Sequence, residues 1–112
     1  MENISYQEKG DRILVTARGE WNLANIKEME QAFSEILMKK PAIIAINCRD
    51  LAGVDSTAIA TLVKTLRKSK ETNIKLIFYD LSPSIQHTFE LMTLNKFFTI
   101  MTRDRFEEEF GG

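Results

Sequence analysis

The continuous apolar run AIIAI at residues 42–46 constrains the fold more than any other feature of the sequence. A strand with one face in water alternates apolar and polar residues, whereas a run without alternation is typical of a strand buried on both faces of a helix-covered sheet. Residues 76–79 form a second, shorter apolar run. A segment with helical periodicity lies between the two runs, so we expect a crossover unit with two parallel central strands.

The segments before this run predict a hairpin and a helix. Alternation around Ile4 and around Ile13, on either side of a turn signal at residues 9–11, indicates two paired strands, and Gly19 is expected to end the hairpin. Apolar residues at helical spacing then predict an amphipathic helix that ends before Pro41. Its apolar stripe consists of Ile26, Met29, Phe33, Ile36 and Leu37.

Further elements follow the apolar run. One helix begins at Asp55 and Ser56, and the next begins with Ser82 as N-cap and Pro83 in its first turn. A short strand is expected at residues 97–101, and a terminal helix after it. A chain of 112 residues suits one domain, so we expect a single α/β domain spanning residues 1–112. Its element order is β-β-α-β-α-β-α-β-α, with a mixed sheet of four to five strands covered by about four helices.

Charge and composition narrow the functional classes. The formal net charge is −1, so no overall field attracts nucleic acid or an anionic membrane, and no apolar run is long enough for membrane insertion. The single cysteine, Cys48, cannot form an internal disulfide and indicates a reducing compartment, so we expect a cytoplasmic protein. With one histidine and one cysteine we expect no metal, and without a glycine-rich phosphate loop no cofactor. The oligomeric state stays open between monomer and weak dimer, because Phe110 can pack on its own domain or on a second copy.

Several residues have the chemistry of a catalytic or binding group, but their settings favour structural roles. Ser56, Asp55 and His87 supply the residue types of a hydrolase triad, yet Ser56 lacks the flanking glycines of a nucleophile elbow. His87 falls inside a predicted helix with nothing to place it near Ser56. Cys48 is expected to be a small, partly buried hydrophobe. Trp21 is expected in the core rather than as an interface anchor.

A cluster of cations surrounds the second predicted helix. It suggests either an acidic partner or nucleic acid, but no aromatic residues interleave with it, so we favour a solvated helix face whose dipole stabilises cations near its C-terminus. The cluster consists of Lys64, Arg67, Lys68, Lys70 and Lys75.

The tripeptide Asp55-Ser56-Thr57 is an N-cap cluster with a functional alternative. A serine in the first turn of a helix exposes its hydroxyl beside unpaired backbone N–H groups, and the helix dipole favours a phosphate there. Phosphorylation would add about −1.5 to −2 charges to one surface spot without unfolding the domain. That is the physics of a reversible binding switch.

At these residues the sequence resembles a STAS domain of the bacterial anti-sigma-factor antagonist type. The main stretch is INCRDLAGVDSTAI at residues 46–59, similar to the family's strand, loop and helix start with its Asp-Ser pair. Two further stretches are LIFYDLSPSI at 76–85, continued by FELMTLNKFF at 89–98, and GEWN at 19–22. Each motif alone is weak, but together they cover nearly the whole chain in the family's order.

The resemblance implies partner switching. The unphosphorylated domain binds an anti-sigma factor that is also a serine kinase, phosphorylation of Ser56 ends the binding, and a PP2C-type phosphatase resets the domain. Such a protein is a ligand and a kinase substrate, with no catalytic residues of its own. The expected binding surface surrounds Ser56 and consists of Asn22, Leu23, Asp55, Thr57 and Ile59, with Asp55 orienting or helping to activate the Ser56 hydroxyl.

Three positions depart from the family pattern. Asn22 and Asn47 stand where the family often has aspartate, and Ala58 stands where it has glycine. Asn22 removes a charge near Ser56, and Ala58 adds a methyl group where a kinase backbone would approach. These departures give weight to a second hypothesis, in which the domain is a scaffold or adaptor subunit of a lipid-transport or stress-sensing assembly and Ser56 is a helix cap.

Overall fold

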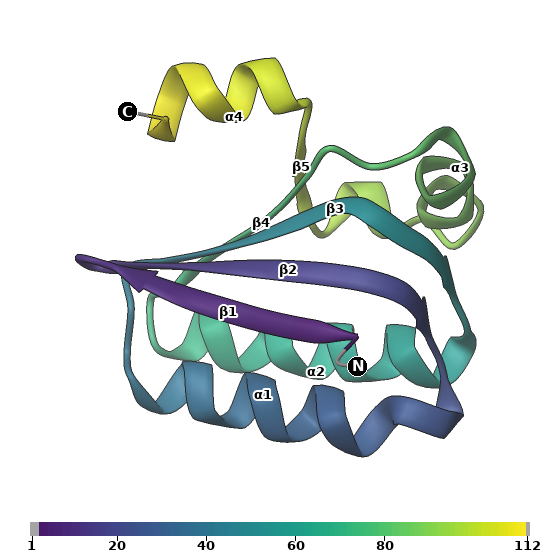
Figure 1. Cartoon of the computed structure of the whole chain (residues 1–112), viewed down its shortest axis with the longest axis horizontal. Helices are drawn as coiled ribbons and strands as arrows, with labels where there is room; N and C mark the ends of the chain where they lie inside the picture. The colour runs from purple at the N-terminus through teal and green to yellow at the C-terminus, as the bar shows by residue number, and fades with distance from the viewer. Residues whose placement is uncertain (1–2, 112) are drawn as a thin grey trace.

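Five strands form one mixed sheet in the order β1-β2-β3-β4-β5 in the computed structural model, which describes residues 3–111 (Figure 1). The strands are β1 (Ile4–Lys9), β2 (Arg12–Trp21), β3 (Ile43–Val54), β4 (Lys75–Tyr79) and β5 (Thr99–Met101). The helices are α1 (Ile26–Met38), α2 (Ser56–Glu71), α3 (Pro83–Leu91) and α4 (Arg103–Phe110), with 3-10 turns η1 (Leu23–Asn25) and η2 (Leu94–Lys96). The predicted α/β class and element order are confirmed.

Strand directions follow from the connections. β1 pairs antiparallel with β2 through the turn at Gly10, whose φ of 62° suits glycine. β3 pairs parallel with β2 and β4, and β4 pairs parallel with β5, as helical crossovers require. The pairing of β2 with β1 ends at Ala17, shortly before Gly19, but β2 itself continues to Trp21 alongside β3. Gly19 lies at an irregularity of the β2–β3 ladder with φ 65°.

β3 is longer than the sequence predicts. The apolar run that predicts this strand ends at Ile46, whereas β3 runs to Val54. Its second half pairs with the end of β2, up to Trp21 opposite Val54, while its pairing with β4 stops at Asn47. This half lacks a neighbour on the β4 side, which is why polar residues occur in it.

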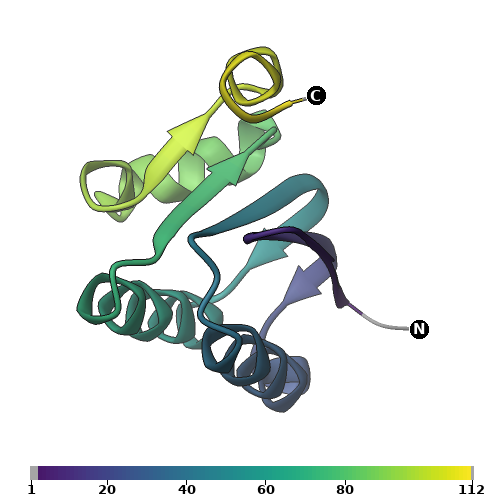
Figure 2. The same cartoon turned by 90° about the vertical axis from the view of Figure 1, so that its left-hand side faces the viewer.

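One face of the sheet carries the larger core. α1 and α2 lie side by side beneath it (Figures 1 and 2), and α3 contributes Ile85 and Phe89 to the same cluster. Phe78 of β4 packs edge-on against Phe89 with ring centroids 5.6 Å apart. Trp21 is fully buried in this core and packs in a T-shaped arrangement on Phe33, so the predicted core position of Trp21 is confirmed.

The connection from α3 to β5 differs from the expectation. α3 ends at Leu91, and Met92, directly after it, is exposed. Residue Thr93 has φ 62°, so the chain turns away from the helix into η2. The last strand begins at Thr99 rather than at Phe97, and Phe97 is 61% exposed.

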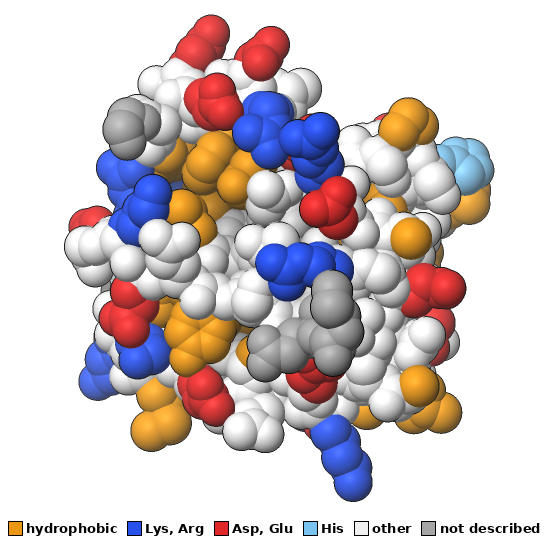
Figure 3. All heavy atoms as spheres, in the orientation of Figure 1, with side chains coloured by type: hydrophobic (Ala, Val, Ile, Leu, Met, Phe, Trp, Pro, Cys, Tyr) orange, Lys and Arg blue, Asp and Glu red, His pale blue; other side chains and the backbone are white. Residues whose placement is uncertain are grey.

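α4 covers part of the other face over a smaller core. Phe106 stacks on Tyr79 with ring centroids 3.9 Å apart, and Phe110 packs on Phe106. Arg12 and Lys75 each lie 5.7 Å from the centre of the Phe110 ring. Figure 3 shows hydrophobic side chains next to Lys and Arg side chains on this face of the molecule. Phe110 therefore packs on its own domain. Among the helices in residues 3–111, none has the length and hydropathy needed to cross a membrane.

Candidate protein-interaction site

The start of α2 is organised by Asp55. Asp55 Oδ1 accepts a hydrogen bond from the backbone N–H of Ala58 at 2.9 Å, which satisfies one of the free donors of the first helical turn. The backbone N–H of Asp55 donates to the carbonyl of Trp21 at 3.1 Å, which fixes the cap to the end of β2. The N-cap of α2 is therefore Asp55, and Ser56 occupies the first helical position.

The second carboxylate oxygen of Asp55 ties α2 to η1. Oδ2 accepts a hydrogen bond from the backbone N–H of Leu23 at 3.0 Å, across 32 residues of chain. The bond from Ala58 above all, together with that from Leu23, holds the pKa of the Asp55 carboxyl below its usual value despite some desolvation. A carboxylate engaged in this way is a weak proton acceptor. Asp55 is thus better suited to clamp the two segments together than to activate the Ser56 hydroxyl.

A capping box shapes η1 on the other side of this clamp. Asn22 Oδ1 accepts from the N–H of Ala24 at 2.9 Å, and the N–H of Asn22 donates to Asn25 Oδ1 at 2.9 Å. The amide of Asn25 also donates to the carbonyl of Glu20. Both asparagine side chains are therefore used within the turn, which presents Leu23 to solvent with 68% of its surface exposed.

Most of the predicted binding residues share one surface, formed by η1 and the first turn of α2. Leu23 and Ser56 are exposed, and the other members are partly buried. Ile59 is an error of the sequence interpretation: it is 5% exposed and belongs to the core, because the helical repeat turns it towards the sheet. We call the remaining set the Ser56 surface. It consists of Asn22, Leu23, Asp55, Ser56 and Thr57.

Two of the departures from the family pattern have local explanations. Ala58 is completely buried, so its methyl group faces the core and does not meet an approaching protein, contrary to the concern raised by the sequence. Asn47 lies on β3, where its Oδ1 accepts from the N–H of Arg49 at 3.0 Å.

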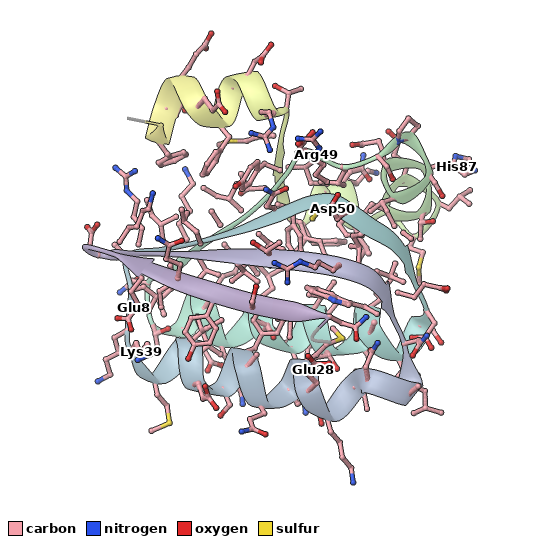
Figure 4. The ribbon with its side chains drawn as sticks, in the orientation of Figure 1. Glu8, Glu28, Lys39, Arg49, Asp50 and His87 are labelled. Carbon is pink, nitrogen blue, oxygen red and sulfur yellow. The ribbon has the colours of Figure 1, made fainter. Side chains whose placement is uncertain are left out.

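The residues considered for catalysis do not converge on Ser56. His87 is exposed on α3 and points outward from the body of the molecule (Figure 4). Cys48 is fully buried in the core, and burial raises the pKa of its thiol to about 12, so the thiol stays protonated. Within the described part of the chain, no group of three His, Cys, Asp or Glu side chains is arranged to hold a metal ion.

Two elements of the site were missed by sequence reasoning. The Asp55-Ser56 helix start is a local signal and was visible in the sequence, whereas the capping box of Asn22 and Asn25 was not predicted. The hydrogen bond between Asp55 and Leu23 joins segments 32 residues apart, so no local pattern reveals it. The two residues meet only in the folded chain.

Comparisons with known proteins place this geometry in context. A family model described as STAS domain matches residues 3–108. A structure from Thermotoga maritima, assigned as an anti-sigma factor antagonist, matches with a TM-score of 0.84 at 19% identity, covering 95% of this chain and 92% of that one. The Bacillus cell fate determinant SpoIIAA in its phosphorylated form matches with a TM-score of 0.71 at 14% identity, covering 95% and 97%.

A third structure, a sulfate transporter family protein from Wolinella succinogenes, matches with a TM-score of 0.72 at 9% identity, covering 86% of this chain and 81% of that one. No curated protein matches the sequence as a relative. At these identities the solved structures are similar to this chain in fold.

Proposed function

Because this chain belongs to the STAS domain family, we propose that it is an anti-sigma-factor antagonist that works by partner switching. In its unphosphorylated form it binds an anti-sigma factor that is also a serine kinase, and this frees the sigma factor. The kinase transfers the γ-phosphoryl group of ATP to the Ser56 hydroxyl, which loses its proton as ADP leaves, and binding ends. A PP2C-type phosphatase hydrolyses the phosphate and resets the chain, which acts as ligand and substrate rather than as enzyme.

The observation that carries this proposal is the position of Ser56. Its side chain is exposed at the first position of α2, directly after the clamped Asp55 and on the same surface as the exposed Leu23. A protein that buries Leu23 must therefore also approach Ser56. This arrangement is expected for a surface on which one partner protein contacts both the apolar anchor, Leu23, and the modification site, Ser56.

A phosphate at Ser56 would change binding more than folding. The helix dipole and the free N–H groups of the first turn favour a negative group there, so α2 stays formed. The added charge, about −1.5 to −2, would lie beside the ionised Asp55 and the apolar Leu23. A partner packing on Leu23 would have to desolvate a dianion, which opposes binding.

Affinity capture from the native cell extract tests the proposal. Wild type, Ser56→Asp and Ser56→Ala serve as baits, and bound proteins are identified by mass spectrometry. Ser84→Asp is the matched control, because Ser84 is also exposed in the first turn of a helix, α3. We expect wild type, Ser56→Ala and Ser84→Asp to retain an ATP-binding kinase that Ser56→Asp does not retain. Retention of the same kinase by all four baits would refute the switch.

A scaffold or adaptor role remains the second candidate. It is favoured by Asn22, which places an uncharged amide where the antagonist pattern often has a carboxylate, and by the fold similarity to a sulfate transporter family protein. In that case the capture experiment recovers components of a larger assembly, equally with wild type and with Ser56→Asp.

A further inference from the structure

An apolar groove lies along α2, away from the Ser56 surface. A hollow of about 350 Å³ opens between α2 and the segment that contains η2. Val63, Leu66 and Leu94 line it, and Phe97, which is 61% exposed, stands at its rim. Exposed apolar side chains gathered in a concave site are typical of an interaction surface.

Two cations line this groove. Arg67 and Lys70 line it, and α2 as a whole carries four cationic residues and one glutamate, although the chain has a net charge of −1. None of the ion pairs found among residues 3–111 includes a cation of α2 or of η2. These cations are Lys64, Arg67, Lys68, Lys70 and Lys96, of which Lys64 and Lys68 face α1 rather than the groove.

We propose that this groove is a second protein-docking site, which binds an acidic amphipathic helix of a partner protein. The apolar stripe of such a helix would fill the hollow between Leu66 and Leu94, and its Asp and Glu residues would face Arg67 and Lys70. Nucleic acid would use the cations but leave the apolar hollow empty. A bilayer surface requires several protruding apolar groups, whereas Val63, Leu66 and Leu94 are recessed and Phe97 alone among the apolar lining residues protrudes.

The groove and the Ser56 surface are separate sites on one helix. The groove residues Val63 and Lys70 follow Ser56 by 7 and 14 residues, which corresponds to about 10–20 Å along the axis. No residue of the Ser56 surface lines the groove. The proposal stands independently of the switch.

A synthetic helix serves as the probe: a fluorescein-labelled peptide with leucines at i, i+3, i+4 and i+7 flanked by glutamates. Its control is the same peptide with lysine at every glutamate position. Fluorescence anisotropy gives the affinity, and ¹⁵N-¹H spectra of the whole chain locate the site. We expect saturable binding of the acidic peptide, weakened by added salt, with shifts centred on Val63, Leu66 and Leu94.

Variants test the apolar and the charged contributions to peptide binding separately. Phe97→Ala is expected to weaken the acidic peptide at least fivefold, and Arg67→Glu combined with Lys70→Glu to reverse the preference in favour of the lysine peptide. The matched controls on α1, Met38→Ala and Lys27→Glu, alter an exposed apolar residue and an exposed cation and should leave affinity unchanged, as should Ser56→Asp. Circular dichroism confirms that each variant is folded.

Three results would overturn the proposal. They are the absence of saturable binding at millimolar peptide, shifts confined to another surface, and equal affinity for both peptides. Sedimentation with vesicles of phosphatidylglycerol and phosphatidylcholine, and titration with single-stranded DNA, examine the other occupants. If the vesicles or the DNA bind more tightly than the acidic peptide, and Phe97→Ala abolishes that binding, then the groove binds a membrane surface or nucleic acid and not an acidic helix.

Discussion

Trp21 links the core to the Ser56 surface, and its replacement by phenylalanine tests the packing described above. The indole Nε1–H donates to the carbonyl of Asn3 at 3.0 Å, the ring is fully buried against Phe33, and the Trp21 carbonyl accepts from the N–H of Asp55. Phenylalanine keeps one ring but loses the hydrogen bond and leaves space in the core.

The expected loss can be worked out from these contacts. The hydrogen bond contributes about 1 kcal/mol. The Asn3 carbonyl still accepts from the N–H of Arg18 at 2.8 Å, so no buried acceptor is left unpaired. The missing ring removes about 1–2 kcal/mol through lost burial and incomplete repacking. Trp21→Phe should therefore lower the free energy of unfolding by about 2–3 kcal/mol and Tm by roughly 10 °C for a domain of this size.

Urea denaturation followed by far-UV circular dichroism measures this change, since Trp21 is the sole tryptophan and its fluorescence is lost in the variant. Phe97→Ala is the control, because Phe97 is largely exposed, and it should change the free energy of unfolding by less than about 0.5 kcal/mol. A loss below about 0.5 kcal/mol for Trp21→Phe would refute the packing argument.

Three further predictions concern the helix start and the thiol. Ser56→Ala should change the free energy of unfolding by less than about 0.5 kcal/mol, because Asp55 caps α2, and a clearly larger loss in urea denaturation would show that Ser56 is the cap. The pKa of Asp55 is lower in the folded than in the unfolded protein, so the ionised carboxyl stabilises the folded state. This stabilisation is fully present above the unfolded pKa of about 3.9 and is lost as the pH falls through the folded pKa. The stability difference between wild type and Asp55→Asn should accordingly shrink in urea titrations on going from neutral pH to below that value, and a constant difference would contradict this cause. Cys48 should not react with iodoacetamide at neutral pH in the folded protein but should react in guanidinium, as mass spectrometry can show, and rapid native labelling would contradict its burial.

Local sequence signals predicted the elements well. The apolar run at residues 42–46 indicated parallel central strands, because a strand buried on both faces lacks the alternation of a half-buried strand. The stripe before Pro41 indicated an amphipathic helix, because its apolar residues recur at helical spacing. Ser82 and Pro83 marked the start of α3, where Ser82 Oγ accepts from the N–H of Ile85. These features depend on neighbours within one turn or one strand.

The errors lie where distant segments decide. The second half of β3 is a strand because β2 extends alongside it. β2 continues past Gly19 because its pairing with β3 resumes after a register shift between Gly19 and Glu20. Phe97 was expected in a strand but is exposed on the rim of a groove that exists only when η2 lies on α2. Ile59 is the exception: its helical phase, a local signal, already directs it to the core, yet it was assigned to the binding surface.

The sequence alone determined the fold class, the order of the elements and the place of Ser56 at a helix start, because periodicity and capping are short-range properties of the chain. The tertiary structure decided which residues surround Ser56. The clamp from Asp55 to Leu23 and the groove between Leu66 and Leu94 join residues far apart in sequence. Such contacts arise from the packing of whole elements, which no local pattern encodes.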